Sequence, residues 1–201
     1  MQFFSYLING ISLGSVYALI ALGYTMVYGI AKMLNFAHGD VIMIGSYVVY
    51  FAFGASGLNP VLSIVLSMIV CTILGVVIER LAYRPLREAP SLAVLITAIG
   101  VSYLLQQVAQ LSWSSNPKSF TSVVSGMKPV SLFGGQLTIS AETIVTIVAC
   151  VVIMVVLMWF VNYTPAGHAM LAVSEDRGAA QLMGVNVNGT ISLTFAIGSA
   201  L

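Results

Sequence analysis

The sequence contains very few charged residues. Asp, Glu, Lys and Arg make up only 6% of its 201 residues, whereas 59% are hydrophobic and the mean hydropathy is +1.03. Soluble domains carry about 25% charged residues. A chain with so few cannot cover a water-facing surface, so its main solvent is expected to be lipid. The net charge of +1 provides no basic surface for nucleic acid, and no nucleic-acid partner is expected.

The motifs of several enzyme and metal-site classes are absent as well. There is no CxxC and no HExxH, and the missing GxxxxGK[ST] excludes a P-loop ATPase. Cys71 and Cys150 each fall inside an apolar run, where buried free thiols are favoured over a disulfide or a metal site. His38 and His168 have no nucleophile beside them. We therefore expect neither catalytic residues nor a metal centre, and not an enzyme.

Long apolar runs dominate the rest of the chain. A helix needs about 20 apolar residues to cross a bilayer core of about 30 Å, and these runs are too continuous for the alternating strands of a membrane barrel. No Lys or Arg precedes the first run, so it lacks the n-region of a signal peptide. The predicted spans cover residues 3–30, 41–57, 60–78, 92–111 and 142–161, and a sixth begins near Thr190.

The predicted fold is therefore all-α. It is a polytopic membrane helix bundle with about five complete transmembrane helices plus a truncated sixth. The sixth run is too short to cross before Leu201, so residues 1–201 are interpreted as a single transmembrane domain of a longer protein. Gly10, Gly14 and Gly23 lie on one side of the first span with Ala18 and Ala21. Such small residues favour close helix packing over a role in a pore.

Positive charge is concentrated after the third span, at Arg80, Arg84 and Arg87. The positive-inside rule places this segment in the cytoplasm. Alternation then places residues 31–40 and 162–189 inside, and residues 113–141 and the N-terminus outside. A re-entrant second span would instead reverse the N-terminus. The outer segment combines Gly and Pro with strand-forming residues, which predicts a small hairpin.

A polar cluster separates the first two spans. Asn35, His38, Gly39 and Asp40 follow Lys32 in a chain that has few such groups. Polar groups near or inside a membrane are costly and are candidates for a substrate path or gate. The alternative is a wet cytoplasmic turn in which Asp40 caps the second span, because an Asp side chain accepts hydrogen bonds from free helix N–H groups. Local chemistry leaves both interpretations open.

A second cluster lies in the long inner loop. Ser174 has the chemistry of an N-cap, Glu175 and Asp176 would complement the helix dipole in the first turn, and Gly184 suits the position after a helix end. The enclosed helix carries an apolar ridge of Ala179, Leu182 and Met183. Such a helix either docks into a groove of another protein or lies against the membrane surface.

Several motifs in order along the chain carry a family resemblance. Residues 17–29 (YALIALGYTMVYG) and 34–40 (LNFAHGD) resemble the opening of bacterial ABC-transporter permeases for branched-chain amino acids, the LivH type. Residues 80–87 (RLAYRPLR) are similar to the first cytoplasmic loop of that family. Residues 167–176 (GHAMLAVSED) and 179–186 (AAQLMGVN) resemble its ATPase-contacting loop, and residues 194–198 (TFAIG) its next helix.

The resemblance implies roles for the second cluster. Importers of this kind carry an "EAA" loop that reads Glu-Ala-Ala, three residues, Gly. Ala179, Ala180 and Gly184 match it, but Gly178 replaces the Glu, which puts in doubt a carboxylate at that position. By resemblance, residues 174–184 form the coupling helix that docks on the ATPase, and its site residues are Ser174, Glu175, Asp176, Ala179, Ala180, Leu182, Met183 and Gly184.

The resemblance also implies a function. It is that of a permease subunit of an ATP-driven importer for leucine, isoleucine and valine in the bacterial inner membrane. The implied partners are a second, related or identical permease, two P-loop ATPases, an external solute-binding protein, the amino acid and membrane lipid. ATP would be used by the ATPases, with no cofactor bound here. Urea, short amides or other amino acids remain alternative substrates, and an ATPase-independent secondary transporter or a membrane scaffold remains an alternative class.

Overall fold

The computed structural model describes residues 2–87, 89–118, 130–132 and 137–201. The described chain is almost entirely helical, which confirms the predicted helix bundle. Its helices are α1 (Gln2–Ala31), α2 (His38–Val49), η1 (Tyr50–Ala55), α3 (Pro60–Ile78), η2 (Glu79–Tyr83), η3 (Arg84–Leu86), α4 (Ser91–Trp113), α5 (Ala141–Tyr163), α6 (Pro165–Glu175), α7 (Arg177–Leu182) and α8 (Val187–Ala200). Two short strands, β1 (Val130–Leu132) and β2 (Leu137–Ile139), complete it.

Local signals explain where several helices begin. The Asn59 side chain accepts a hydrogen bond from the N–H of Val61, and Pro60 follows at the first helical position of α3. Thr164 and Pro165 repeat this arrangement at α6, and Ser140 caps α5. The long helices thus begin within a few residues of the predicted spans, because caps and apolar runs coincide in the sequence.

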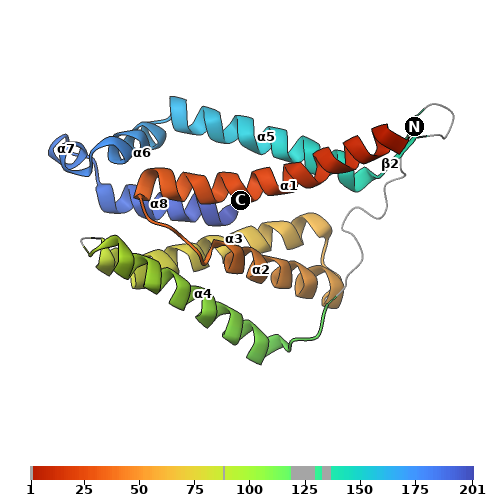
Figure 1. Cartoon of the computed structure of the whole chain (residues 1–201), viewed down its shortest axis with the longest axis horizontal. Helices are drawn as coiled ribbons and strands as arrows, with labels where there is room; N and C mark the ends of the chain where they lie inside the picture. Colours follow the sequence, from red (N-terminus) through yellow and green to blue (C-terminus); the bar gives the residue numbers. More distant parts are fainter. Residues whose placement is uncertain (1, 88, 119–129, 133–136) are drawn as a thin grey trace.

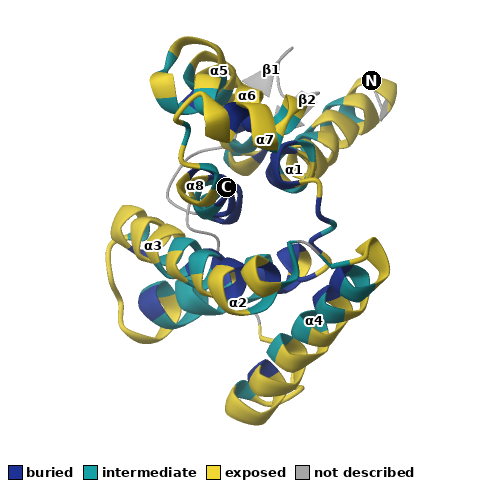
Figure 2. Cartoon of the chain, turned by 90° about the vertical axis from the view of Figure 1, so that its left-hand side faces the viewer, coloured by how far each residue is buried: buried dark blue, intermediate teal, exposed yellow. Residues whose placement is uncertain are grey.

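The helices form two groups with α8 between them (Figures 1 and 2). α1 and α5 pack together on one side, and α2, α3 and α4 form the other. α8 contacts both α1 and α3. α6 and α7 lie at one end of the bundle, and the N-terminus lies at the other end with the hairpin (Figure 1). The contacts of α8 therefore join two helix layers that otherwise touch little.

Small residues allow the helices of these groups to approach closely. A Cβ atom at Gly23 of α1 would lie 2.8 Å from the carbonyl oxygen of Gly198 of α8. One at Gly45 of α2 would lie 2.8 Å from Sγ of Cys71 of α3. Of the glycines predicted to serve packing along α1, only Gly23 does so here, since Gly10 and Gly14 have nothing within 4 Å. Cys71 and Cys150 are buried free thiols, as predicted.

Four described helices are long and apolar enough to cross a membrane: Phe3–Ala31, Pro60–Leu86, Ser91–Trp113 and Ala141–Tyr163. The chain is a multi-pass membrane protein. The predicted second span is not one of the four, because it is divided between α2 and the π-helix η1. The count of five complete spans therefore stays a prediction.

α2 begins deeper inside the bundle than the sequence predicted. His38 contacts Gly23, which lies eight residues before the end of α1 and so about 12 Å inside the bundle. Residues 32–37 therefore run back along α1, and residues 31–40 are not a turn confined to the bundle end. η1 then continues to the hairpin end, where the ring of Phe51 lies 5.9 Å from that of Trp113 at the end of α4. The second predicted span thus begins inside the bundle and ends at the hairpin end, and the re-entrant alternative stays a prediction.

The arginine-rich segment after α3 also differs from the prediction. It was expected to be a loop, but residues 79–86 continue α3 as the π-helix η2 and the 3₁₀-helix η3. Glu79 and Tyr83 are completely buried within η2. Charged residues ended the predicted span, yet a buried ion pair allows the helix to continue past them.

The predicted outer hairpin is confirmed in its described part. β1 and β2 pair antiparallel, with Val130 opposite Ile139 and Leu132 opposite Leu137. Residues 119–129 and 133–136, which include most of the Gly, Pro and β-forming residues behind that prediction, lie outside the described residues.

Candidate functional site

Asp40 is a buried carboxylate that bonds two polar side chains of α4 from the start of α2. Its carboxylate accepts hydrogen bonds from the hydroxyl of Ser102 and, at 3.0 Å, from Nε2 of Gln106. Ser102 is at the middle of α4, and Asp40 is only 8% exposed. Among the described residues no Lys, Arg or His pairs with it. Burying a carboxylate without a countercharge costs free energy, because the charge loses its hydration.

This geometry corrects the capping alternative. The N-cap of α2 is Ala37, which has no side-chain cap, and Asp40 lies three residues further on. Its negative charge still complements the helix dipole from the first turn. The carboxylate binds the neighbouring helix instead of its own N–H groups, so Asp40 ties α2 to α4.

His38 lies on another side of the same helix start. It is 4% exposed, its ring lies against Gly23, and the ring centroid is 6.2 Å from that of Tyr24. Its Nδ1 is buried and has no hydrogen-bond partner within the described chain. Buried polar atoms are nearly always paired, so an unpaired one at this depth marks a place where a ligand or a water could bind.

Asn35 and Gly39 complete the predicted cluster. The hydroxyl of Tyr83 donates a 3.0 Å hydrogen bond to Oδ1 of Asn35, which is also buried. Gly39 is exposed and has open space around it. Asn35, His38 and Asp40 therefore contact three different elements, η2, α1 and α4, and do not share one pocket. Their burial excludes the wet-turn interpretation for these three side chains.

Sequence reasoning missed the partners Ser102, Gln106 and Tyr83. A signal for two of them was present, because Ser102 and Gln106 are polar residues four apart in a mainly apolar span. That spacing places them on one face of a helix. Tyr83 carried no such signal, since nothing in the sequence relates it to Asn35.

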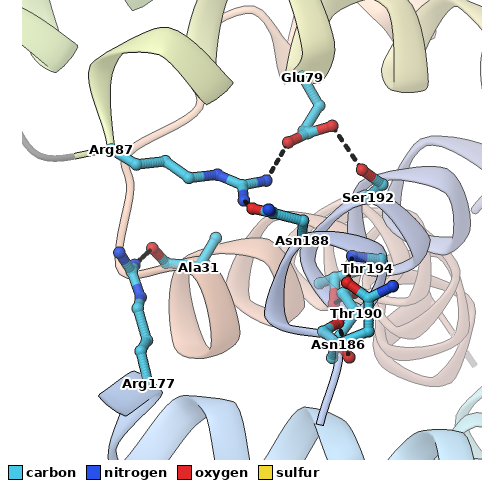
Figure 3. A network of polar contacts seen from close by, with 10 residues as sticks. Ala31, Glu79, Arg87, Arg177, Asn186, Asn188, Thr190, Ser192 and Thr194 are labelled. Carbon is cyan, nitrogen blue, oxygen red and sulfur yellow. Dashed lines mark hydrogen bonds and ion pairs between the residues drawn. The ribbon is translucent and has the colours of Figure 1, made fainter. Parts of the chain in front are cut away.

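A second polar network lies at the end of the bundle near α7 (Figure 3). The buried carboxylate of Glu79 pairs with Arg87 and accepts a 2.6 Å hydrogen bond from the hydroxyl of Ser192 in α8. Arg87 also donates to Oδ1 of Asn188, just after the start of α8. This network holds the α3 extension against α8.

The predicted coupling segment consists of two helices. Ser174 was expected to be the N-cap, but Ser174 and Glu175 end α6 and the Ser174 hydroxyl donates back to the carbonyl of Leu171. Asp176 is the N-cap of α7 instead, since its Oδ1 accepts from the N–H of Gly178 at 2.7 Å and of Ala179 at 3.0 Å. A charged cap two residues later outcompetes Ser174, whose side chain is satisfied within α6.

The end of α7 is the one that the sequence predicted. Gly184 has φ +87°, and the N–H groups of Gly184 and Val185 bond to the carbonyls of Gln181 and Ala180. This is a Schellman motif, in which glycine avoids the penalty of a left-handed backbone. Just before it, Leu182 and Met183 are 91% and 85% exposed.

The neighbouring small residues face different ways. Ala179 is exposed beside Leu182 and Met183, whereas Ala180 is buried in the core. Together, Ala179, Leu182 and Met183 form the α7 ridge, an apolar surface on a short rigid helix at the bundle end. Exposed large apolar side chains on such a capped helix are typical of a docking surface.

Arg177 joins α7 to the end of α1, just before residues 32–37. Its guanidinium donates to the carbonyl oxygen of Ala31, the last residue of α1, as Figure 3 shows. Burial, and next the positive charge of Arg87, lowers the pKa of Arg177 from its ordinary value. The two predicted site clusters are thus connected by one hydrogen bond, because Ala31 directly precedes the segment that leads to His38 and Asp40.

No metal site is evident in the part of the chain that the structure describes. Within it, no three His, Cys, Asp or Glu side chains come together in a way that could hold a metal ion. The arrangement offers hydrogen-bonding groups at mid-bundle and the exposed apolar α7 ridge at one end.

Comparison with known proteins places this chain in a family. The family model of the branched-chain amino acid transport system permease component matches residues 6–201. The chain is 42% identical over 207 residues to the high-affinity branched-chain amino acid transport system permease protein BraD of Pseudomonas aeruginosa, covering 97% of this chain and 66% of the relative. LivH of Escherichia coli, with the same descriptive name, is 39% identical over 212 residues, covering 100% and 68%.

A more distant relative is the probable branched-chain amino acid transport permease protein LivH of Methanocaldococcus jannaschii, 29% identical over 194 residues. The chain spans about two thirds of the length of the bacterial relatives. No solved structure matches it significantly. The family consists of transport components and not of enzymes, as the sequence predicted. The chain belongs to the family of branched-chain amino acid transport system permease components.

Proposed function

We propose that this chain is the permease subunit of an ATP-binding-cassette importer for leucine, isoleucine and valine in the bacterial inner membrane. The observation that carries the proposal is the match of residues 6–201 to the permease family, together with 39–42% identity to proteins named for this transport. The proposed assembly contains a second permease, two P-loop ATPases and an external solute-binding protein. ATP is bound by the ATPases and not by this chain.

The α7 ridge is the proposed ATPase contact. A short helix with both ends capped holds its shape when it enters a groove, and Leu182 and Met183 bring large apolar surfaces that the chain itself leaves uncovered. Asp176 and the Schellman end at Gly184 contribute rigidity and not contact area. Ser174 and Glu175 form the end of α6, which leads directly into α7.

Movement of α7 has a direct route into the bundle. When the ATPases close on ATP, α7 shifts, and Arg177 transmits the shift to the carbonyl of Ala31. The following segment leads to Asn35, His38, Gly39 and Asp40, which are the proposed path or gate. The unpaired Nδ1 of His38 and the uncompensated carboxylate of Asp40 support that role, because each would gain from a polar ligand.

Purification in mild detergent from the native membrane tests the assembly. Recovery of two P-loop ATPases and a second multi-span protein with the chain is the expected result. The variant Leu182→Ser/Met183→Ser should lose the ATPases while remaining in the membrane. Leu111→Ser is the matched control, because Leu111 is 87% exposed near the end of α4, away from α7. Equal ATPase recovery from the ridge variant and the control would disprove docking by α7.

Uptake measurements test the coupling. Replacing Gly184 by Val forces a β-branched residue into a left-handed backbone, which costs about 1–2 kcal/mol and distorts the end of α7. The variant should bind the ATPases weakly and import little substrate, although it is still inserted. Radiolabelled leucine uptake into cells or vesicles is the measurement, and normal uptake would contradict the coupling role.

One observation favours a second candidate, a secondary transporter that needs no ATPase. Such transporters place broken helices and polar groups near mid-bilayer, and His38 and Asp40 lie at mid-bundle here. Uptake that persists in vesicles without ATP but responds to an ion gradient would support this alternative. The exposed α7 ridge fits the importer, in which an ATPase covers it, whereas in a self-contained transporter it would have to lie against the membrane surface.

A further inference from the structure

A cleft at the α7 end of the bundle gathers an unusual share of the positive charge. It has a volume of about 410 Å³, within the roughly 300–1,000 Å³ of small-ligand sites. Lys32, Arg87 and Arg177 all line it. These are three of the seven Lys and Arg residues in the sequence, and they come from three distant parts of it. We name this cavity the basic cleft.

The carboxylates that the structure describes neutralise only one of these three cations. Glu79 pairs with Arg87, but Lys32 and Arg177 have no ion-pair partner among the described residues. Asp176, beside Arg177 in the chain, uses its Oδ1 to cap α7. Arg87 is also close enough to Arg177 that, after burial, its positive charge lowers the pKa of Arg177. Two cations so close together are stabilised by an anion between them.

Unsatisfied donors point to the same kind of ligand. Nε of Arg87 is buried and has no partner in the described structure, although the rest of its guanidinium is bonded to Glu79 and Asn188. The N-terminus of α4 also borders the cleft at Ser91, and no side chain caps it. A helix N-terminus with free N–H groups attracts anions. The cleft thus offers guanidinium, ammonium and backbone donors to one ligand.

Lys32 occupies a position that normally suits glycine. Its φ is +52°, and its N–H bonds to the carbonyl of Tyr28 at the end of α1. A left-handed backbone costs a non-glycine residue about 1–2 kcal/mol. If this residue only ended the helix, glycine would be more stable at this backbone conformation. We therefore infer that lysine is present for its charge.

The wall of the cleft and its depth select the type of anion. Tyr28, Leu34, Val94 and Leu95 give it an apolar side. It lies where two candidate membrane helices end and begin, at Ala31 and Ser91, which is the level where hydrocarbon meets headgroups. We propose that the basic cleft binds the phosphate of an anionic phospholipid, with the acyl chains along its apolar side. The site is independent of the transport cargo and of ATP.

Lipid retention by the purified protein, with whatever subunits accompany it, tests the proposal. The delipidated sample is incubated with equal amounts of phosphatidylglycerol and phosphatidylcholine in mixed micelles, and the lipids that remain bound are quantified by mass spectrometry. Wild type should retain phosphatidylglycerol preferentially. Lys32→Gly should reduce that preference about fivefold, the worth of one basic residue near an anionic lipid. Because glycine suits this backbone, the variant should fold at least as well as wild type.

Two matched variants separate the site from general charge. Lys32→Arg keeps the cation and should keep the preference. Arg84→Gln removes an exposed cation at the same end that does not line the cleft, and should leave the preference unchanged. Equal retention by wild type and Lys32→Gly, or an equal loss in Arg84→Gln, would overturn the proposal.

Two further arms identify the source of the anion. Excess inorganic phosphate should not displace the lipid, and displacement would reassign the cleft to a soluble phosphate. If the Lys32→Cys variant cross-linked to an ATPase subunit, the basic cleft would instead be a binding site for an acidic protein surface. Lipid retention is measured without transport, so its failure would leave the proposed importer function unaffected.

Discussion

Asp40 and Glu79 are both carboxylates buried among helices, but they are stabilised in different ways. Glu79 is fully buried at the α7 end of the bundle, where it pairs with Arg87 and accepts from Ser192. Asp40 lies in the middle of the bundle and has only the neutral donors Ser102 and Gln106. The first carboxylate has a countercharge and the second has none.

This difference separates a structural role from a functional one. A buried ion pair holds two elements in register, and removing one member leaves the other uncompensated. An unpaired carboxylate contributes little that an amide would not, yet its desolvation is costly. Its presence at mid-bundle is therefore better explained by a ligand or a moving part than by stability.

The largest expected effect follows from breaking the ion pair. Glu79→Gln leaves the guanidinium of Arg87, which is only 11% exposed, without a countercharge. We expect a loss of about 3–5 kcal/mol in unfolding free energy. Thermal unfolding in detergent measures it. The double variant Glu79→Gln/Arg87→Gln should recover most of the loss, and a single variant as stable as wild type would show that the pair is not buried.

The two carboxylates also show what sequence could and could not predict. Hydropathy and caps placed α1, α3, α4 and α5 correctly, because a long apolar run and its bounding residues are local features. The predictions that relied on charged residues were less accurate. Glu79 ended the predicted third span although η2 continues, and the alternative in which Asp40 caps the second span is wrong because its carboxylate contacts α4.

The remaining misses are matters of long-range pairing. Ser102 and Tyr83 lie 62 and 48 residues from their partners Asp40 and Asn35. No local pattern specifies such contacts, because they depend on how helices pack. In the coupling segment, Asp176 and Ser174 are both good caps two residues apart, and the choice depends on where α6 ends. Gly184 was predictable, since glycine alone avoids strain at its φ.

The next effect concerns the neutral donors of Asp40. Ser102→Ala removes one of the two hydrogen bonds to a buried charge, and we expect a loss of about 1.5–3 kcal/mol. Ser102→Thr keeps the hydroxyl and serves as the control. If Ser102→Ala unfolds at the same temperature as wild type, the carboxylate of Asp40 must be satisfied by water or by another ligand.

A smaller effect tests the helix seam that supports Glu79. Gly75 lies one turn before Glu79, and a Cβ there would lie 2.5 Å from Cβ of Ser199 and 3.1 Å from the carbonyl oxygen of Phe195. Gly75→Ala should therefore push α3 from α8 at a cost of about 1–3 kcal/mol. Gly14→Ala in α1 is the control, because nothing lies within 4 Å of it. Equal stability of the two variants would mean that the seam is loosely packed.

Asp40→Asn should have the smallest effect on stability and a large one on transport. The amide keeps an acceptor for Ser102, its NH2 can donate to Gln106 once the Gln106 amide turns round, and an uncompensated charge is removed. The unfolding free energy should therefore change by about 1 kcal/mol or less. The same chemical change at Glu79 is expected to be the most damaging of the four. Leucine uptake by Asp40→Asn should fall about tenfold or more, because a charge-assisted contact made during transport is lost. If uptake is normal and only stability falls, Asp40 is a structural residue like Glu79, and the distinction between the two carboxylates fails.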